Sequence, residues 1–143
     1  MAQLRLSYPK LSADAYAGLI KCKTALEGNA LELSLLELVY LRISQINGCA
    51  FCLEMHSTSL REHNFAQNKL DALNGWRVSE RFSVRERAAL MWAEAVTHIS
   101  AVNTDDTIYQ QVKAHFTDAE MSDLTIAIGL MNAFNRIAIS LRQ

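Results

Sequence analysis

The sequence ELVYLRISQINGCAFCLEMH occupies residues 37–56. Its first half carries apolar residues at helical spacing up to Asn47-Gly48, a pair typical of a helix end. The second half resumes immediately with a Cys-x-x-Cys pair. We therefore predict two helices joined by a tight turn, one beginning at Ser34 and the other running from about Cys49 to His63.

The rest of the chain shows the same helical periodicity, and no segment alternates with the period of a strand. Three Ser/Thr-x-x-Glu patterns predict capping boxes at Ser34–Glu37, Ser83–Glu86 and Thr117–Glu120. Residues 1–11 contain the only proline, Pro9, and are expected to form an extended lead-in. With 5 glycines in the chain, breaks are few. We predict one all-α domain over residues 1–143, a compact multi-helix bundle with further helices at 13–27, 66–73, 83–99, 105–115 and 117–141.

The bulk composition limits the possible functions. The chain has 143 residues and a formal net charge of −1, so it lacks the basic footprint of a nucleic-acid-binding protein. Its first residues contain no apolar signal-peptide core, and no uninterrupted apolar run approaches the roughly 18 residues of a membrane span. We therefore expect a cytoplasmic protein. There a close cysteine pair is more often catalytic or metal-binding than structural, whereas the third cysteine, Cys22, is expected to be a small buried residue.

Cys49 and Cys52 are the residues best suited to carry chemistry. On a helix that begins near Gly48, both cysteines and His56 fall along one stripe, with Cys52 and His56 one turn apart. Unpaired N–H groups at the start of a helix stabilise a thiolate, which is the reactive form of cysteine. A neighbouring histidine stabilises it further. We expect the three side chains to share one accessible edge.

Glu37 lies on the preceding helix, and its carboxylate approaches the cysteines if the two helices fold back on each other. It could then accept a proton from a thiol or orient His56. As the last residue of a capping-box pattern, it also has a purely structural interpretation. A further alternative is a zinc site, for which Glu37, Cys49, Cys52 and His56 would supply the four ligands.

These residues resemble those of a known family. The family pattern is a Glu, eleven residues, Cys-x-x-Cys, three residues and a His, and this sequence satisfies every spacing from Glu37 to His56. The stretches FSVRERA (82–88) and NAFNR (132–136) are also similar to the family. Over most of its length beyond residue 12, the chain resembles the alkylhydroperoxidase D-like proteins of the carboxymuconolactone decarboxylase superfamily.

The resemblance implies an all-helical fold that assembles into trimers or hexamers and uses no metal or bound organic cofactor. It implies a thiol peroxidase in which Cys52, served by His56, attacks the O–O bond of a hydroperoxide and becomes a sulfenic acid. Cys49, with Glu37 as its proton acceptor, then closes the Cys49–Cys52 disulfide, which an external thiol reduces. Position at the helix start would instead favour Cys49 as the nucleophile. We follow the resemblance because His56 lies one turn from Cys52.

Other functions also fit these residues. One is a general dithiol–disulfide oxidoreductase that serves a protein partner, and another is a redox-sensing oligomer with little peroxidase activity. A decarboxylase fits less well, because that chemistry does not require a cysteine pair. The expected partners are a hydroperoxide substrate and an external reductant, such as a lipoylated or thioredoxin-like protein or a small thiol, with no nucleic acid and no membrane. The leading prediction is therefore a cytoplasmic, homo-oligomeric antioxidant enzyme.

Overall fold

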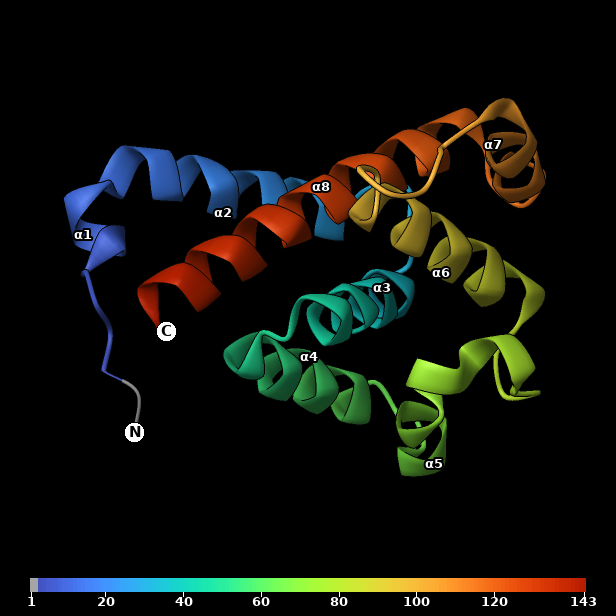
Figure 1. Cartoon of the computed structure of the whole chain (residues 1–143), viewed down its shortest axis with the longest axis horizontal. Helices are drawn as coiled ribbons and strands as arrows, with labels where there is room; N and C mark the ends of the chain where they lie inside the picture. Colours follow the sequence, from blue (N-terminus) through green and yellow to red (C-terminus); the bar gives the residue numbers. More distant parts are fainter. Residues whose placement is uncertain (1–2) are drawn as a thin grey trace.

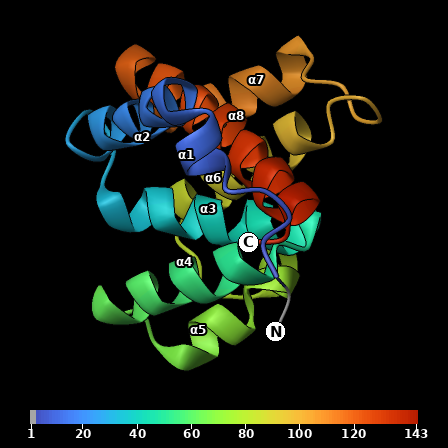
Figure 2. The same cartoon turned by 90° about the vertical axis from the view of Figure 1, so that its left-hand side faces the viewer.

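Helix α3 is the central element of the fold. The structure is a computed structural model that describes residues 3–143, and within that range it contains helices and loops but no strand. Helix α4 packs on one side of α3, α8 packs on the other side and α6 also contacts it, while α2 lies against α8 (Figure 1; Figure 2). The predicted all-α class is confirmed. In chain order the elements are α1 (Tyr8–Leu11), α2 (Ala13–Glu27), α3 (Leu33–Asn47), α4 (Ala50–Glu62), α5 (Gln67–Asp71), the 3₁₀ helix η1 (Leu73–Val78), α6 (Val84–Thr97), α7 (Asp106–Lys113) and α8 (Asp118–Leu141).

Two apolar cores lie on different sides of α3, which explains why this helix is apolar around most of its circumference. The first core joins α3 to α2, α6 and α8 and includes Leu36 and Ile128. The second joins α3 to α4, η1 and α6 and includes Leu38, Leu60 and Trp76. Because α3 contributes to both cores, every side chain from position 35 to position 41 is buried.

Helix ends follow the local signals in most places. Gly48 ends α3 with a positive φ of 73°, a conformation that side chains other than glycine rarely adopt. Ser83 and Thr117 form complete capping boxes at the starts of α6 and α8. These two predicted boxes are confirmed, and they fix where the long helices of the core begin.

Some local predictions are wrong. Helix α3 begins at Leu33 after Glu32, and Ser34 lies inside the helix, so the predicted capping box at Ser34 does not form. The predicted lead-in is helical at Tyr8–Leu11, because Pro9 is accommodated in a first turn, where its missing N–H costs nothing; residues 1–2 of that lead-in lie outside the described residues. The predicted helix at 66–73 is divided into α5 and η1.

Helix α8 is the one helix of the described residues that is long and apolar enough, by length and composition alone, to cross a membrane. A core helix of a globular protein passes the same test. Packing against α2, α3, α4 and α6 accounts for part of its apolar character, since 39% of the apolar stretch is buried. It also buries two polar side chains, Asp123 and Asn135, and both hydrogen-bond to other helices or to the loop before α3.

Candidate active site

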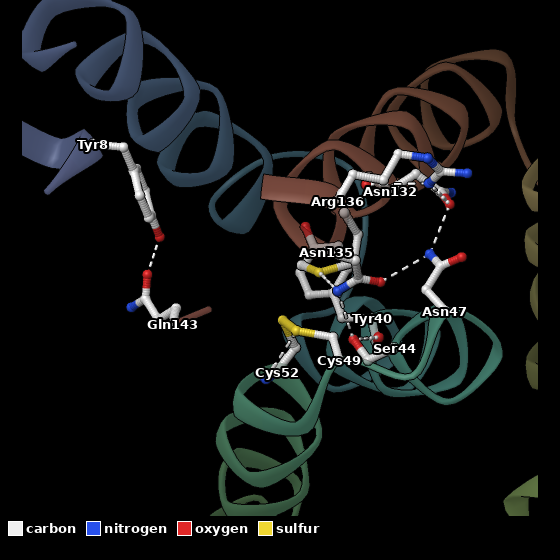
Figure 3. The surroundings of a disulfide bond; sticks show 11 residues. Tyr8, Tyr40, Ser44, Asn47, Cys49, Cys52, Asn132, Asn135, Arg136 and Gln143 are labelled. Atoms are coloured by element: carbon white, nitrogen blue, oxygen red, sulfur yellow. Dashed lines mark hydrogen bonds between the residues drawn. A yellow bond between two sulfur atoms is a disulfide. The ribbon is translucent and has the colours of Figure 1, made fainter. Parts of the chain in front are cut away.

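The two cysteines form a disulfide at the start of α4 (Figure 3). Gly48 turns the chain after α3, so Cys49 becomes the N-cap of α4 and Cys52 lies in its first turn, with 5.3 Å between their Cα atoms. The Cys49 sulfur also accepts a hydrogen bond from the backbone N–H of Cys52 at 3.4 Å. The predicted pairing distance is therefore present, although Cys49 stands just outside the helix that carries Cys52.

A buried acid–imidazole pair joins α3 to α4. The Glu37 Oε2 atom lies 2.7 Å from Nδ1 of His56, and the two residues are only 5% and 1% exposed. Because a carboxylate can only accept, the imidazole donates through Nδ1–H, which leaves Nε2 of the neutral ring as an acceptor. Within residues 3–143 no atom hydrogen-bonds Nε2. His56 follows Cys52 by one helical turn, so this free nitrogen belongs to a ring on the same side of α4 as the sulfur.

The site is more enclosed than the sequence predicted. Cys49 and Cys52 are 1% and 3% exposed, because Ala138 of α8 packs directly on the disulfide. The sequence predicted that Cys49, Cys52 and His56 share one accessible edge of the helix. That prediction is wrong, because all three side chains are buried. Access is instead through a pocket of about 260 Å³, whose wall includes Cys52 and the neighbouring side chains Phe51 and Met55.

A polar network, which sequence reasoning missed, holds the turn before Cys49 (Figure 3). Asn135 of α8 donates to Ser44 Oγ at 3.1 Å and accepts from the Asn47 side chain at 3.0 Å. Asn47 also donates to Asn132 at 2.9 Å. The backbone carbonyl of Ser44 accepts from the N–H of Cys49 at 3.1 Å. The end of α3 is thus fixed against α8 at the point where the chain enters the disulfide.

Tyr40 is a second missed residue near the acid–imidazole pair. Its ring centroid lies 5.3 Å from that of His56, and its side chain is fully buried. Burial raises the pKa of Tyr40, and the charge of Glu37 raises it further, so the hydroxyl stays protonated. The Tyr40 ring therefore forms an uncharged wall behind His56.

The zinc alternative lacks its ligand set in this arrangement. Within the described part of the chain, no group of three or more His, Cys, Asp or Glu side chains is placed to hold a metal ion. The two sulfurs bond to each other and Glu37 bonds to His56. A structural zinc site would need four side chains around one point.

Comparison with known proteins agrees with the fold. The profile of the carboxymuconolactone decarboxylase family matches residues 13–95. The crystal structure of a protein of unknown function from Agrobacterium tumefaciens, with a suggested role as the antioxidant defence protein AhpD, superposes with a TM-score of 0.93 at 35% identity, over 99% of this chain and 97% of that one. The chain belongs to the carboxymuconolactone decarboxylase family and, within it, to the alkylhydroperoxidase D-like proteins.

More distant similarities extend to proteins of other names. The uncharacterized protein YdfG of Bacillus subtilis is 28% identical over 96% of this chain and 93% of its own length. A debrominase, Bmp8, solved with 2,3,4-tribromopyrrole, shares the fold with a TM-score of 0.73 at 19% identity, over 92% of this chain and 68% of that one. The shared fold therefore does not by itself define the reaction.

Proposed function

We infer that the chain is a thiol peroxidase that reduces organic hydroperoxides through a Cys49–Cys52 dithiol/disulfide cycle. The observation that carries this proposal is the combination of a disulfide at a helix start with a buried Glu37–His56 pair one turn further on. A disulfide alone would fit many oxidoreductases. A proton acceptor fixed on the same side of the helix as Cys52 supports an attacking thiolate at that sulfur.

The first half of the cycle oxidises Cys52. The Cys52 thiol gives its proton to Nε2 of His56, and the thiolate attacks the O–O bond of the hydroperoxide. The S–O bond forms as the O–O bond breaks, so Cys52 becomes a sulfenic acid and the alcohol leaves with the proton returned by His56. Glu37 orients the ring through Nδ1 and stabilises its charged form while it holds the proton.

The second half closes and reopens the disulfide. The Cys49 sulfur attacks the sulfenic sulfur of Cys52, the S–S bond forms, and the displaced hydroxide leaves as water with the Cys49 proton. An external thiol or dithiol then supplies two electrons and two protons to restore both thiols. Direct proton transfer from Cys49 to Glu37, which the resemblance implies, stays a prediction, because the contact of Glu37 is with His56.

The pocket also supports Cys52 as the attacking sulfur. Cys52 is part of the pocket wall and Cys49 is not, so a substrate that enters the pocket meets Cys52 first. This favours the order implied by the resemblance over the order suggested by helix position alone. The exposed side chains Phe51 and Met55 flank the same opening and give a reductant an apolar surface to approach.

Mass spectrometry after one equivalent of peroxide tests the proposal. We expect the reduced wild type to form the disulfide, Cys49→Ser to gain one oxygen at Cys52, and Cys52→Ser to remain unoxidised. Cys22→Ser is the matched control and should behave like the wild type, because Cys22 lies on α2 outside the disulfide. An unoxidised Cys52 in Cys49→Ser would contradict the proposal.

Steady-state assays separate the alternatives. Peroxide turnover with dithiothreitol as reductant supports the peroxidase, and Cys52→Ser should abolish it. Reduction of insulin disulfides without peroxide turnover would favour the general oxidoreductase. A disulfide that forms and reopens without turnover against any donor would favour a sensor.

A further inference from the structure

The pocket beside Cys52 is built by four helices from the beginning, the middle and the end of the chain. Helices α1, α2, α4 and α8 and the C-terminal residue Gln143 contribute side chains to its wall, and α4 carries Cys52. Its volume is about 260 Å³. The lining residues are Tyr8, Tyr16, Ile20, Lys23, Thr24, Phe51, Cys52, Met55, Met131, Phe134, Ala138 and Gln143.

The lining is aromatic and apolar. Tyr8 and Tyr16 meet edge to face at 5.5 Å between ring centroids, and Tyr16 meets Phe134 in the same way at 6.4 Å. The Tyr8 hydroxyl is already bonded to the side chain of Gln143. Among the described residues that line the pocket, Lys23 is the only charged one, and its ammonium is paired with Glu27. The pocket therefore offers a prospective ligand ring faces and hydrocarbon rather than unpaired charges.

The pocket is larger than hydrogen peroxide requires. A cavity of about 150 Å³ holds a benzene molecule, whereas one water takes about 30 Å³ of liquid volume. A volume of about 260 Å³ therefore has room for a benzene ring with a branched substituent. Hydrogen peroxide would occupy only a small part of the pocket and would leave its apolar wall in contact with water.

We propose that this pocket binds the hydrocarbon part of an aromatic or branched organic hydroperoxide and presents its O–O bond to Cys52. This inference rests on the proposed peroxidase function and adds a specificity site to it. The reaction is the one described above, and the alcohol leaves from the same pocket. Tyr8, Tyr16 and Phe134 are the residues assigned to select the substrate.

The matched family profile covers only part of the pocket. The family profile matches residues 13–95, so Tyr8, Phe134 and Gln143 lie outside it. The segment that carries Tyr8 is held in place by the Arg5 N–H, which donates to the Leu141 carbonyl at 2.8 Å. Substrate selection is therefore assigned to α1, α2 and the second half of α8, whereas the chemistry belongs to α3 and α4.

Binding of an unreactive alcohol tests the pocket without turnover. The probe is 2-phenyl-2-propanol, the alcohol formed from cumene hydroperoxide, titrated into the oxidised protein while the methyl resonances of Met55 and Met131 are followed by NMR. We expect saturable shifts in the wild type and at least about tenfold weaker binding in Ile20→Trp, which fills the pocket. Thr24→Phe is a second filling variant from the same wall. Ile126→Trp is the matched control, because Ile126 is an exposed residue of α8 outside the pocket.

The kinetic arm separates this proposal from the peroxidase function. We expect the ratio of kcat/KM for cumene hydroperoxide over that for hydrogen peroxide to fall at least about tenfold in Ile20→Trp and not in Ile126→Trp. Turnover of both peroxides with no change in this ratio in either filling variant would overturn the pocket and leave the peroxidase standing. Alcohol binding without turnover of either peroxide would overturn the peroxidase and, with it, the assignment of a hydroperoxide as ligand. No alcohol binding by the wild type would overturn the pocket directly.

Discussion

At the scale of the residue, Glu37 and His56 are the groups whose pairing matters most. Both are nearly fully buried, and their 2.7 Å contact crosses from α3 to α4. Burying a carboxylate costs free energy unless it is paired. The contact between Glu37 and His56 offsets that cost. The same contact fixes which imidazole nitrogen is left free for proton transfer.

Replacing Glu37 tests this pairing. Glu37→Gln keeps the size of the side chain but cannot stabilise a protonated imidazole, so we expect the oxidation of Cys52 by peroxide to slow by about a hundredfold. Stopped-flow tryptophan fluorescence of the reduced protein measures this rate. Glu54→Gln is the matched control, since Glu54 is an exposed residue of the same helix as His56. Equal rates in Glu37→Gln and the wild type would show that the carboxylate has no part in the oxidation step.

At the scale of the element, two of the three Ser/Thr-x-x-Glu patterns cap a helix and one does not. Ser83 and Thr117 accept from the backbone N–H groups of Glu86 and Glu120 at 3.1 and 3.2 Å, and each glutamate bonds back. At Ser34 the box does not form, because Ser34 lies inside α3. The glutamate of this pattern, Glu37, instead contacts His56, 19 residues later. A local motif contains no information about that distant partner.

Alanine substitutions distinguish the three patterns. We expect Ser83→Ala and Thr117→Ala each to lower the free energy of unfolding by about 1 kcal/mol, because each removes a side-chain acceptor for an unpaired N–H. Ser34→Ala should change it by less than about 0.5 kcal/mol, since Ser34 caps nothing. Urea denaturation at neutral pH measures all three. A loss at Ser34 as large as the other two would mean that α3 begins later than Leu33.

At the scale of the whole molecule, Glu94 ties three elements together. Its carboxylate on α6 accepts from Trp76 at 2.8 Å and Arg77 at 2.6 Å, both on η1, and from Arg42 of α3 at 3.0 Å. Burial opposes its ionisation, but these hydrogen bonds outweigh burial and lower the pKa of Glu94 below its usual value. Glu94, Arg77 and Arg42 thus form a charged cluster beside Trp76, at the edge of the second core.

The lowered pKa of Glu94 gives stability a pH dependence of known sign. The folded pKa lies below the unfolded value of about 4.3, so the ionised carboxylate stabilises the fold above that pH, and its contribution is lost as the pH falls through the folded pKa. We expect the urea midpoint of the wild type to fall from pH 6 to pH 3. Glu94→Gln should be less stable by about 1–3 kcal/mol at pH 6 and should lose less on acidification. The exposed residue Glu80 provides the control, Glu80→Gln, and an equal acid response in Glu94→Gln and the wild type would contradict this account.

The assembly of the whole molecule stays a prediction. The resemblance implies a trimer or hexamer, and the chain exposes large apolar side chains on α6 and α8, among them Val84, Ile126 and Ile139. Light scattering after size-exclusion chromatography would measure the mass of the particle against the 16.0 kDa of one chain.

Features that depend on residues close together in the sequence can be predicted from it. Contacts between residues far apart in the sequence cannot. Helix ends at Gly48, Ser83 and Thr117 are local and were predicted correctly, as was the pairing distance of Cys49 and Cys52. The contact of Asn135 with Ser44 spans 91 positions, and no local pattern indicates it. The pocket is harder still to predict, because residues from both ends of the chain line it.

The N-cap of α4 has one more consequence. Cys49 caps the helix with its own sulfur, so the atom that changes oxidation state is also the acceptor for the Cys52 amide. The backbone amide resonance of Cys52 therefore reports whether the cysteine pair is oxidised or reduced. With nitrogen-15 labelling of cysteine alone, NMR would measure the redox state of the pair without a substrate, a reductase or a dye.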